Sequence, residues 1–134
     1  IKSWEEYSFL TNVGPVTKGT GYETAGITGG VGSALGGGIC HTSTLMYQAA
    51  LSLPFLITER EPHTDDGTFY APLEFDATVG AYSDFKFVNT LPYDIRMDAI
   101  IDMESNAITV QFVCLETVDA ALLAEWDGSA LETN

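Results

Sequence analysis

Residues 36–54 read GGGICHTSTLMYQAALSLP, and this stretch decides the fold prediction because it joins a glycine-rich segment to an amphipathic helix. Seven of the thirteen glycines lie between Gly26 and Gly38, where the missing Cβ atoms permit positive φ angles and close backbone approach. The apolar residues that follow have the spacing of one helix face: Leu45, Met46, Ala49, Ala50 and Leu53. Pro54 ends the predicted helix, and the hydroxyl side chains at 42–44 can cap its start.

The second half of the chain favours strands. Apolar and β-prone runs predict strands at 55–58, 68–75, 77–82, 85–87, 95–101 and 108–114, with a turn at 102–106 joining the last two. Ser3 and Glu6 have the spacing of a capping box, which predicts a short helical turn there. A terminal helix is expected over 117–126. A central amphipathic helix packed on a mostly antiparallel sheet is an α+β domain.

The composition bounds the function. The chain has 134 residues, about one domain's worth, and 46% of them are hydrophobic, which is too many for a disordered acidic tail. A net charge of -14 repels phosphate backbones, so no nucleic-acid partner is expected. No apolar run approaches the length of a membrane span, so this segment should not insert into a membrane. Because the chain begins without a Met or a signal peptide, we expect it to be a segment of a longer protein.

The two cysteines have different settings. Cys40 follows three glycines and opens the predicted helix, where free N–H groups and the helix dipole stabilise a thiolate. The alternative is a small buried hydrophobe, the usual state of a free cysteine, but such a residue has no need of the preceding glycines. Cys114 shares a predicted strand face with Ile108, Val110 and Phe112, so we expect a core thiol that forms no disulfide with Cys40.

A nucleophilic thiol needs a base and a group that orients the base. His41 is adjacent to Cys40, and neighbouring helical side chains point about 100° apart, so His63 in the later loop is the better candidate. Asp76 is the natural partner for the imidazole of His63. Taken singly, His63 would be interpreted as a surface loop histidine and Asp76 as a turn-forming acid. The predicted oxyanion and substrate-binding residues are Gly37, Gly38, His41 and Ser43.

Other kinds of site are not predicted. The glycine spacing does not fit a nucleotide-binding motif, and the acidic turns lack the pattern of a calcium loop. Cys40, His41 and His63 lack the paired spacing of a structural zinc site. We therefore expect no metal and no cofactor.

At these residues the sequence resembles the VanW family, which is named after an accessory protein of certain vancomycin-resistance clusters. The family pattern G-G-G-I-C-Q-V-S-S-T-L-Y-N-A-A-L corresponds to residues 36–51, and its R-x-x-H-S to residues 60–64. Its D-A-T-V corresponds to residues 76–79, its D-x-K-F-x-N to residues 84–89, and its opening F-S-F-N-x-x-V-G-P to residues 7–15. The resemblance covers about residues 7–114 of a single VanW-like domain spanning 1–134, with 115–134 as a helical extension.

The resemblance implies an extracytoplasmic protein, in the cell envelope or secreted, that acts on peptidoglycan stem peptides. It implies a cysteine-dependent L,D-transpeptidase, a transferase in which Cys40 forms a thioester with the stem peptide and His63 shuttles protons. The sequence departs from the family pattern beside the nucleophile, with His41 in place of Gln and Thr42 in place of Val. Two alternatives stay open: a non-catalytic peptidoglycan-binding module, and a vancomycin-resistance accessory domain with a protein partner.

Overall fold

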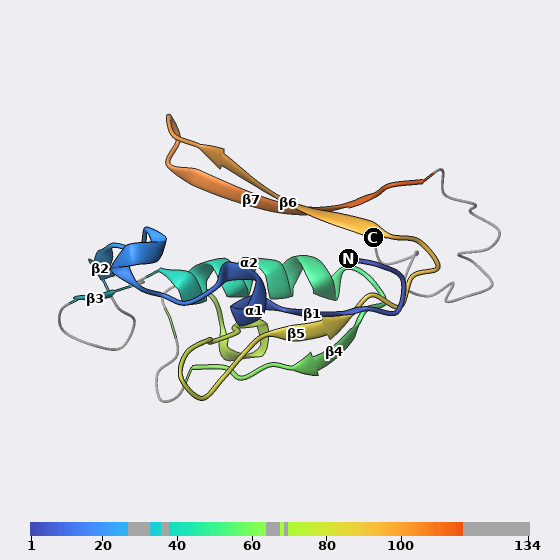
Figure 1. Ribbon diagram of the computed structural model, residues 1–134, viewed down its shortest axis with the longest axis horizontal. Coiled ribbons are helices and arrows are strands. Elements are labelled where there is room, and N and C mark those ends of the chain that lie inside the picture. Colours follow the sequence, from blue (N-terminus) through green and yellow to red (C-terminus); the bar gives the residue numbers. More distant parts are fainter. Residues whose placement is uncertain (27–32, 36–37, 64–67, 69, 117–134) are drawn as a thin grey trace.

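The computed structural model describes residues 1–26, 33–35, 38–63, 68 and 70–116. Its longest helix, α2 (Ile39–Leu51), lies between a three-stranded sheet and a two-stranded hairpin (Figure 1). The antiparallel sheet has the order β1-β5-β4, with β1 at Glu6–Ser8, β5 at Lys86–Val88 and β4 at Leu56–Glu59. The hairpin pairs β6 (Ile95–Asp102) with β7 (Ala107–Cys114). This arrangement confirms the predicted α+β class and its central helix.

The remaining elements are short. β2 (Thr24–Gly26) pairs with β3 (Ser33–Leu35), and these strands lie within or beside the predicted glycine-rich loop. The helical turns are α1 (Phe9–Val13), η1 (Lys18–Thr20) and η2 (Leu73–Phe75). No helix in the part of the chain that the structure describes is long and apolar enough to cross a membrane. The predicted terminal helix over 117–126 lies outside the described residues.

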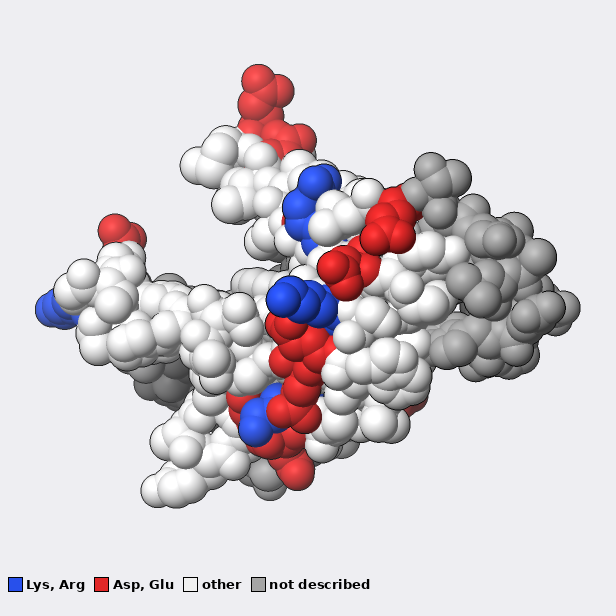
Figure 2. Space-filling view, turned by 45° about the vertical axis from the view of Figure 1, so that its right-hand side comes forward, with Lys and Arg blue, Asp and Glu red and all other residues white. Residues whose placement is uncertain are grey.

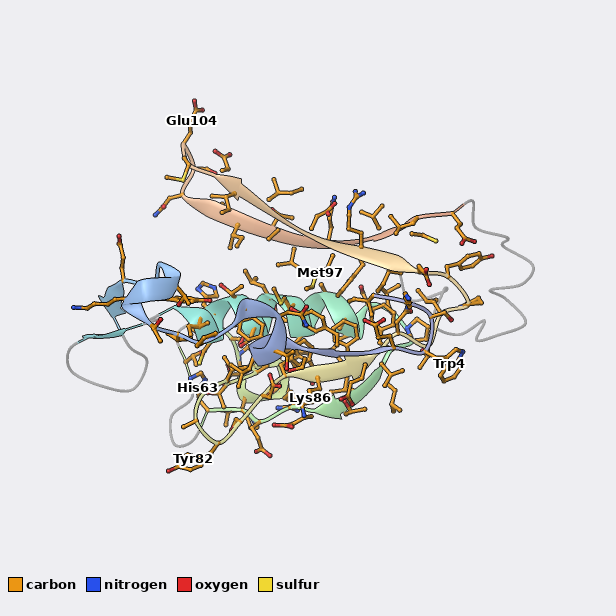
Figure 3. The ribbon with its side chains drawn as sticks, viewed as in Figure 1. Trp4, His63, Tyr82, Lys86, Met97 and Glu104 are labelled. Atoms are coloured by element: carbon orange, nitrogen blue, oxygen red, sulfur yellow. The ribbon has the colours of Figure 1, made fainter. Side chains whose placement is uncertain are left out.

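An aromatic cluster joins the sheet to the hairpin. Phe87 on β5 is fully buried, and its ring centroid lies 5.0 Å from that of Phe55, 5.2 Å from that of Tyr7 and 5.7 Å from that of Phe112. The hairpin contributes Phe112 and Met97, and Figure 3 shows Met97 on the hairpin side of α2. The base of the hairpin is buried at Ile95, whereas its tip extends beyond this core.

The predicted strands at 68–75 and 77–82 are wrong. Leu73–Phe75 form the 3-10 helix η2, and in the rest of the described residues there only Thr78 makes an isolated bridge, to Glu61. The reason lies in the hydrogen bonds of the backbone. Ala77 and Val79 bond to side chains of α2, so these groups are not available for a ladder with a neighbouring strand.

The predicted capping box at Ser3 is also wrong. Glu6 begins β1, and the Ser3 hydroxyl donates to the carbonyl of Leu91. The first helix starts later, where the Ser8 side chain caps α1 by accepting from the N–H of Thr11. The spacing of Ser3 and Glu6 fits a cap, but long-range pairing with the segment before β6 determines the backbone there.

Charged side chains form a band across one face of the molecule, and acidic groups outnumber basic ones (Figure 2). Lys86 pairs with Glu59 across neighbouring strands at 3.6 Å, and Arg96 pairs with Asp98 at 2.7 Å on the hairpin. Exposed pairs of this kind add little to stability. The packing of the aromatic cluster therefore matters more for the fold.

We predict that Phe87→Ala lowers the free energy of unfolding by about 3–5 kcal/mol, because it removes the central ring of a closely packed cluster. Urea denaturation measures the change. Tyr82→Ala is the control, since Tyr82 is 100% exposed and its loss should change the free energy by less than about 0.5 kcal/mol. Equal losses in the two variants would contradict the assigned core.

Burial, and then the nearby Asp84 carboxylate, raise the pKa of Tyr7 to about 12 from its ordinary value of 10.0. The folded state therefore holds the neutral phenol more tightly than the unfolded chain does, and this contribution to stability is lost as the pH rises from 10 toward 12. We predict that stability falls between about pH 10 and about pH 11.5, and that Tyr7→Phe makes this fall shallower. Denaturation across this range tests it. Tyr82→Phe, at an exposed tyrosine, should keep the slope of the parent protein.

Candidate active site

Cys40 lies in the first turn of α2, one residue after its first residue, Ile39. The helix is preceded by Gly38, whose φ of 95° lies in the left-handed region that favours glycine. Gly38 has no side chain to cap the helix, and its carbonyl accepts from the N–H groups of His41 and Thr42. The N–H groups at 39 and 40 come earlier in the first turn, where donors have no partner within a helix. Cys40 thus lies where the first N–H groups of a helix have no helical partner.

The segment Asp76–Val79 lies along the first turns of α2 and is held by three side chains at helical spacing. The Ser43 hydroxyl donates to the carbonyl of Ala77, and the Thr44 hydroxyl accepts from the N–H of Ala77 at 3.0 Å. The thiol of Cys40 is the third group. Positions i, i+3 and i+4 lie on one face of a helix, so these side chains line up along the docked segment.

The Cys40 thiol bonds to the backbone of Val79. The N–H of Val79 donates to Sγ at 3.4 Å, Sγ donates to the carbonyl of Val79 at 3.3 Å, and the Thr78 hydroxyl lies 3.5 Å away. Cys40 is partly buried and packs against the core. Cys114 is likewise a free thiol packed against the core, as expected for the second cysteine.

His63 and Asp76 form a close pair. The Nδ1 atom of His63 lies 2.7 Å from Oδ2 of Asp76, and the backbone N–H of His63 donates to the same oxygen at 2.6 Å. The Asp76 side chain is 0% exposed and that of His63 18% exposed. Figure 3 shows His63 near the N-terminal end of α2, on the side away from the β6–β7 hairpin. The structure therefore brings together the two residues that the sequence paired.

Two further side chains hold Asp76 in place. The Thr44 hydroxyl donates to Oδ1 of Asp76 at 3.0 Å. The guanidinium of Arg60 donates to the carbonyls of Leu73 and Asp76, and it lies 4.9 Å from the ring centroid of Tyr47. Sequence reasoning missed both roles, although the family pattern included Arg60. The signal for Thr44 is its position four residues after Cys40 on the same helix face.

The remaining predicted site residues lie outside the His63–Asp76 pair, and each has its own contacts. His41 is exposed and stacks on Tyr70, with ring centroids 4.2 Å apart. Ser43 is fully buried, so in the resting structure its hydroxyl holds the docked segment. Gly38 is exposed at the start of α2, and Gly37 lies outside the described residues. Among the described residues, the hydrogen bonds of the Cys40 thiol go to Thr78 and Val79, not to His63.

Two residues of the D-x-K-F-x-N motif are structural. Asp84 accepts from the Ser8 hydroxyl and from the N–H groups of Leu10 and Phe85, which fixes the start of α1. Asn89 is fully buried, and its amide donates to the carbonyls of Ile1, Lys2 and Tyr93. These motif residues hold the scaffold and lie outside the candidate site.

A thiol at the start of a helix, beside a segment that carries a buried aspartate paired with a histidine, defines a candidate thiol site in an α+β domain. A sequence model of the family described as VanW like protein matches residues 1–113. The chain belongs to the VanW-like family. No curated protein and no solved structure matches the chain.

We predict that Asp76→Asn lowers the free energy of unfolding by about 1–3 kcal/mol, because a side-chain amide cannot accept at both ends and leaves a buried donor unpaired. Thermal or urea denaturation measures the loss. Glu74→Gln changes an exposed carboxylate two residues away and should stay within about 0.5 kcal/mol of the parent protein. If Asp76→Asn were as stable as that control, the buried network would not contribute as described.

Proposed function

We propose that this domain catalyses cysteine-dependent acyl transfer on peptidoglycan stem peptides, as an L,D-transpeptidase-like enzyme of the cell envelope. In this proposal Cys40 is the nucleophile, His63 is the general base and acid, and Asp76 orients the imidazole. Membership of the VanW-like family supports the cell-wall setting. The proposal includes no cofactor and no insertion of this segment into a membrane.

The observation that carries the proposal is the His63–Asp76 pair, whose buried aspartate lies on a segment that also contacts Cys40. A buried carboxylate bonded to an imidazole is the arrangement that orients a general base. Asp76 lies three positions before Val79, whose backbone bonds to the Cys40 thiol. The proposal therefore takes its nucleophile from the start of α2, its orienting carboxylate from the docked segment and its base from the stretch that follows β4.

The proposed reaction balances in two steps. His63 takes the proton of the Cys40 thiol, and the thiolate attacks the carbonyl that precedes a terminal D-alanine. The C–N bond to D-alanine breaks, the protonated His63 returns the proton to that leaving amine, and the stem peptide remains as a thioester. An amine on a neighbouring stem then attacks the thioester carbonyl and gives a proton to His63. The C–S bond breaks, the new amide leaves, and His63 returns the proton to the Cys40 sulfur.

Backbone donors would stabilise the oxyanion formed in each step. We assign this role to the first N–H groups of α2 and to the backbone at Gly37 and Gly38. His41 would contact the substrate beside the thiol, where the family pattern has Gln. Ser43 would act by holding the docked segment, since its hydroxyl is buried.

A second candidate function is a non-catalytic peptidoglycan-binding or vancomycin-resistance accessory module. The observation that favours it is the bonding of the Cys40 thiol to the backbone of Val79, with the imidazole bonded to Asp76 instead. Catalytic hydrogen bonds are often long before a substrate binds, so the resting geometry is compatible with both functions. A covalent adduct separates them.

We predict that a tetrapeptide stem ending in D-alanine leaves on the protein an adduct whose mass is that of the stem minus D-alanine, because the thioester forms before an acceptor resolves it. Intact-mass spectrometry detects the adduct, and peptide mapping locates it. Cys40→Ala should abolish it, and His63→Gln should slow its formation by about 10²–10⁴-fold.

Cys114→Ala is the matched control, because Cys114 is the other free thiol of the chain and should not carry the adduct. An adduct that persists in Cys40→Ala would overturn the assignment of the nucleophile. Reversible binding of the stem with no adduct in the parent protein would favour the binding module.

A further inference from the structure

We infer that Thr44 is a positioning residue that fixes the proton on Nδ1 of His63 and leaves Nε2 as the atom that exchanges protons with the thiol and the substrate. This role in the reaction rests on the proposed function, whereas the placement of the proton is a property of the resting protein. The inference comes from counting donors and acceptors around the buried carboxylate of Asp76.

Both oxygens of Asp76 face donors. The backbone N–H of His63 can only donate, and it reaches Oδ2 at 2.6 Å. The Thr44 hydroxyl reaches Oδ1 at 3.0 Å. Each oxygen therefore already acts as an acceptor before the imidazole is considered.

The proton of the Thr44 hydroxyl has one favourable direction. Its oxygen accepts from the N–H of Ala77 at 3.0 Å, so the single hydroxyl proton must point to another acceptor. The candidates are Oδ1 of Asp76 at 3.0 Å and the carbonyl of Ala77 at 3.3 Å. The Ala77 carbonyl already accepts from Ser43, and the carboxylate is the stronger acceptor. Thr44 therefore donates to Asp76.

The proton on the imidazole follows from these contacts. An ionised Asp76 has no proton to donate and accepts at both oxygens, so the contact of 2.7 Å between its Oδ2 and Nδ1 of His63 needs a proton on Nδ1. Among the described residues, the hydrogen bonds of the His63 ring are made at Nδ1 alone. In the neutral ring, Nε2 then carries the lone pair, which is the form that a general base requires.

Thr44 is almost completely buried, and its hydroxyl links the helix, the docked segment and the carboxylate. Thr44→Val keeps the shape of the side chain and removes the hydroxyl. Oδ1 of Asp76 then loses its donor, and the carboxylate can turn. The turned carboxylate no longer holds the Nδ1–H bond in one geometry, so the preference of His63 for the Nδ1–H tautomer is lost.

The test is nitrogen NMR of the protein labelled with ¹⁵N-histidine, at a pH where the rings are neutral and without substrate. The chain has two histidines, and His41→Gln assigns the remaining signals to His63. We expect protonated Nδ1 and unprotonated Nε2 in the parent protein, a mixture of tautomers in Thr44→Val, and the parent pattern again in Thr44→Ser.

Ser43→Ala is the matched control. Ser43 is also buried on α2 and also bonds to Ala77, but its hydroxyl contacts no atom of His63 or Asp76. This variant should lose stability yet keep the tautomer of the parent protein. A change of tautomer in Ser43→Ala equal to that in Thr44→Val would assign the effect to loosening of the helix and would overturn the inference.

Two results overturn the placement of the proton directly. One is a proton on Nε2 in the parent protein, which needs no variant and stands even if Thr44→Val fails to fold. The other is an unchanged Nδ1–H pattern in folded Thr44→Val. Because no substrate is present, these results are independent of whether an adduct forms on Cys40.

The role in the reaction has its own readout. If the adduct forms, Thr44→Val should slow its formation by about tenfold, and Thr44→Ser should recover the rate. A normal rate in Thr44→Val with an altered tautomer would overturn the positioning role. Absence of an adduct in the parent protein would remove the proposed function while leaving the NMR result intact.

Discussion

The docking of residues 76–79 on the first turns of α2 is the constraint on which the site depends. Backbone groups in a buried segment need hydrogen-bond partners, and here polar side chains of a helix supply them in place of a neighbouring strand. One set of contacts therefore satisfies the segment, places the Asp76 carboxylate next to His63 and brings a peptide group against the Cys40 thiol. The same hydrogen bonds therefore set the geometry of the site and stabilise the fold.

The scaffold keeps this helix end in position through packing and buried polar contacts. Phe87 joins the sheet to the hairpin, while Asp84 and Asn89 tie the N-terminal residues to the strands that follow the site. The quoted family motifs thus divide by physical role. The docked segment bonds to Cys40 at Val79 and carries Asp76, which pairs with His63, whereas the motif at 84–89 stabilises the architecture around them.

The sequence predicted the features that depend on local pattern. Helical spacing located α2, and alternation located β6, β7 and the turn between them. It mispredicted residues 68–82. β-Propensity does not show that side chains of a helix will bond to the backbone groups that would otherwise pair with a neighbouring strand. The pairing of His63 with Asp76 was predicted from residue chemistry, but the contacts of Thr44 and Arg60 depend on three-dimensional placement and could not be found by spacing alone.

The bond between Cys40 and Val79 couples chemistry at sulfur to the conformation of the backbone. Val79 donates to the sulfur through its N–H and accepts from it through its carbonyl. Loss of the thiol proton or acylation of the sulfur removes the donor to the Val79 carbonyl, and that carbonyl must then find water or another partner. Because such coupling works in both directions, a shift of residues 76–79 also changes the equilibrium between the free and the modified Cys40 thiol. The chemical state of the Cys40 sulfur is thereby linked to the position of the segment that carries Asp76.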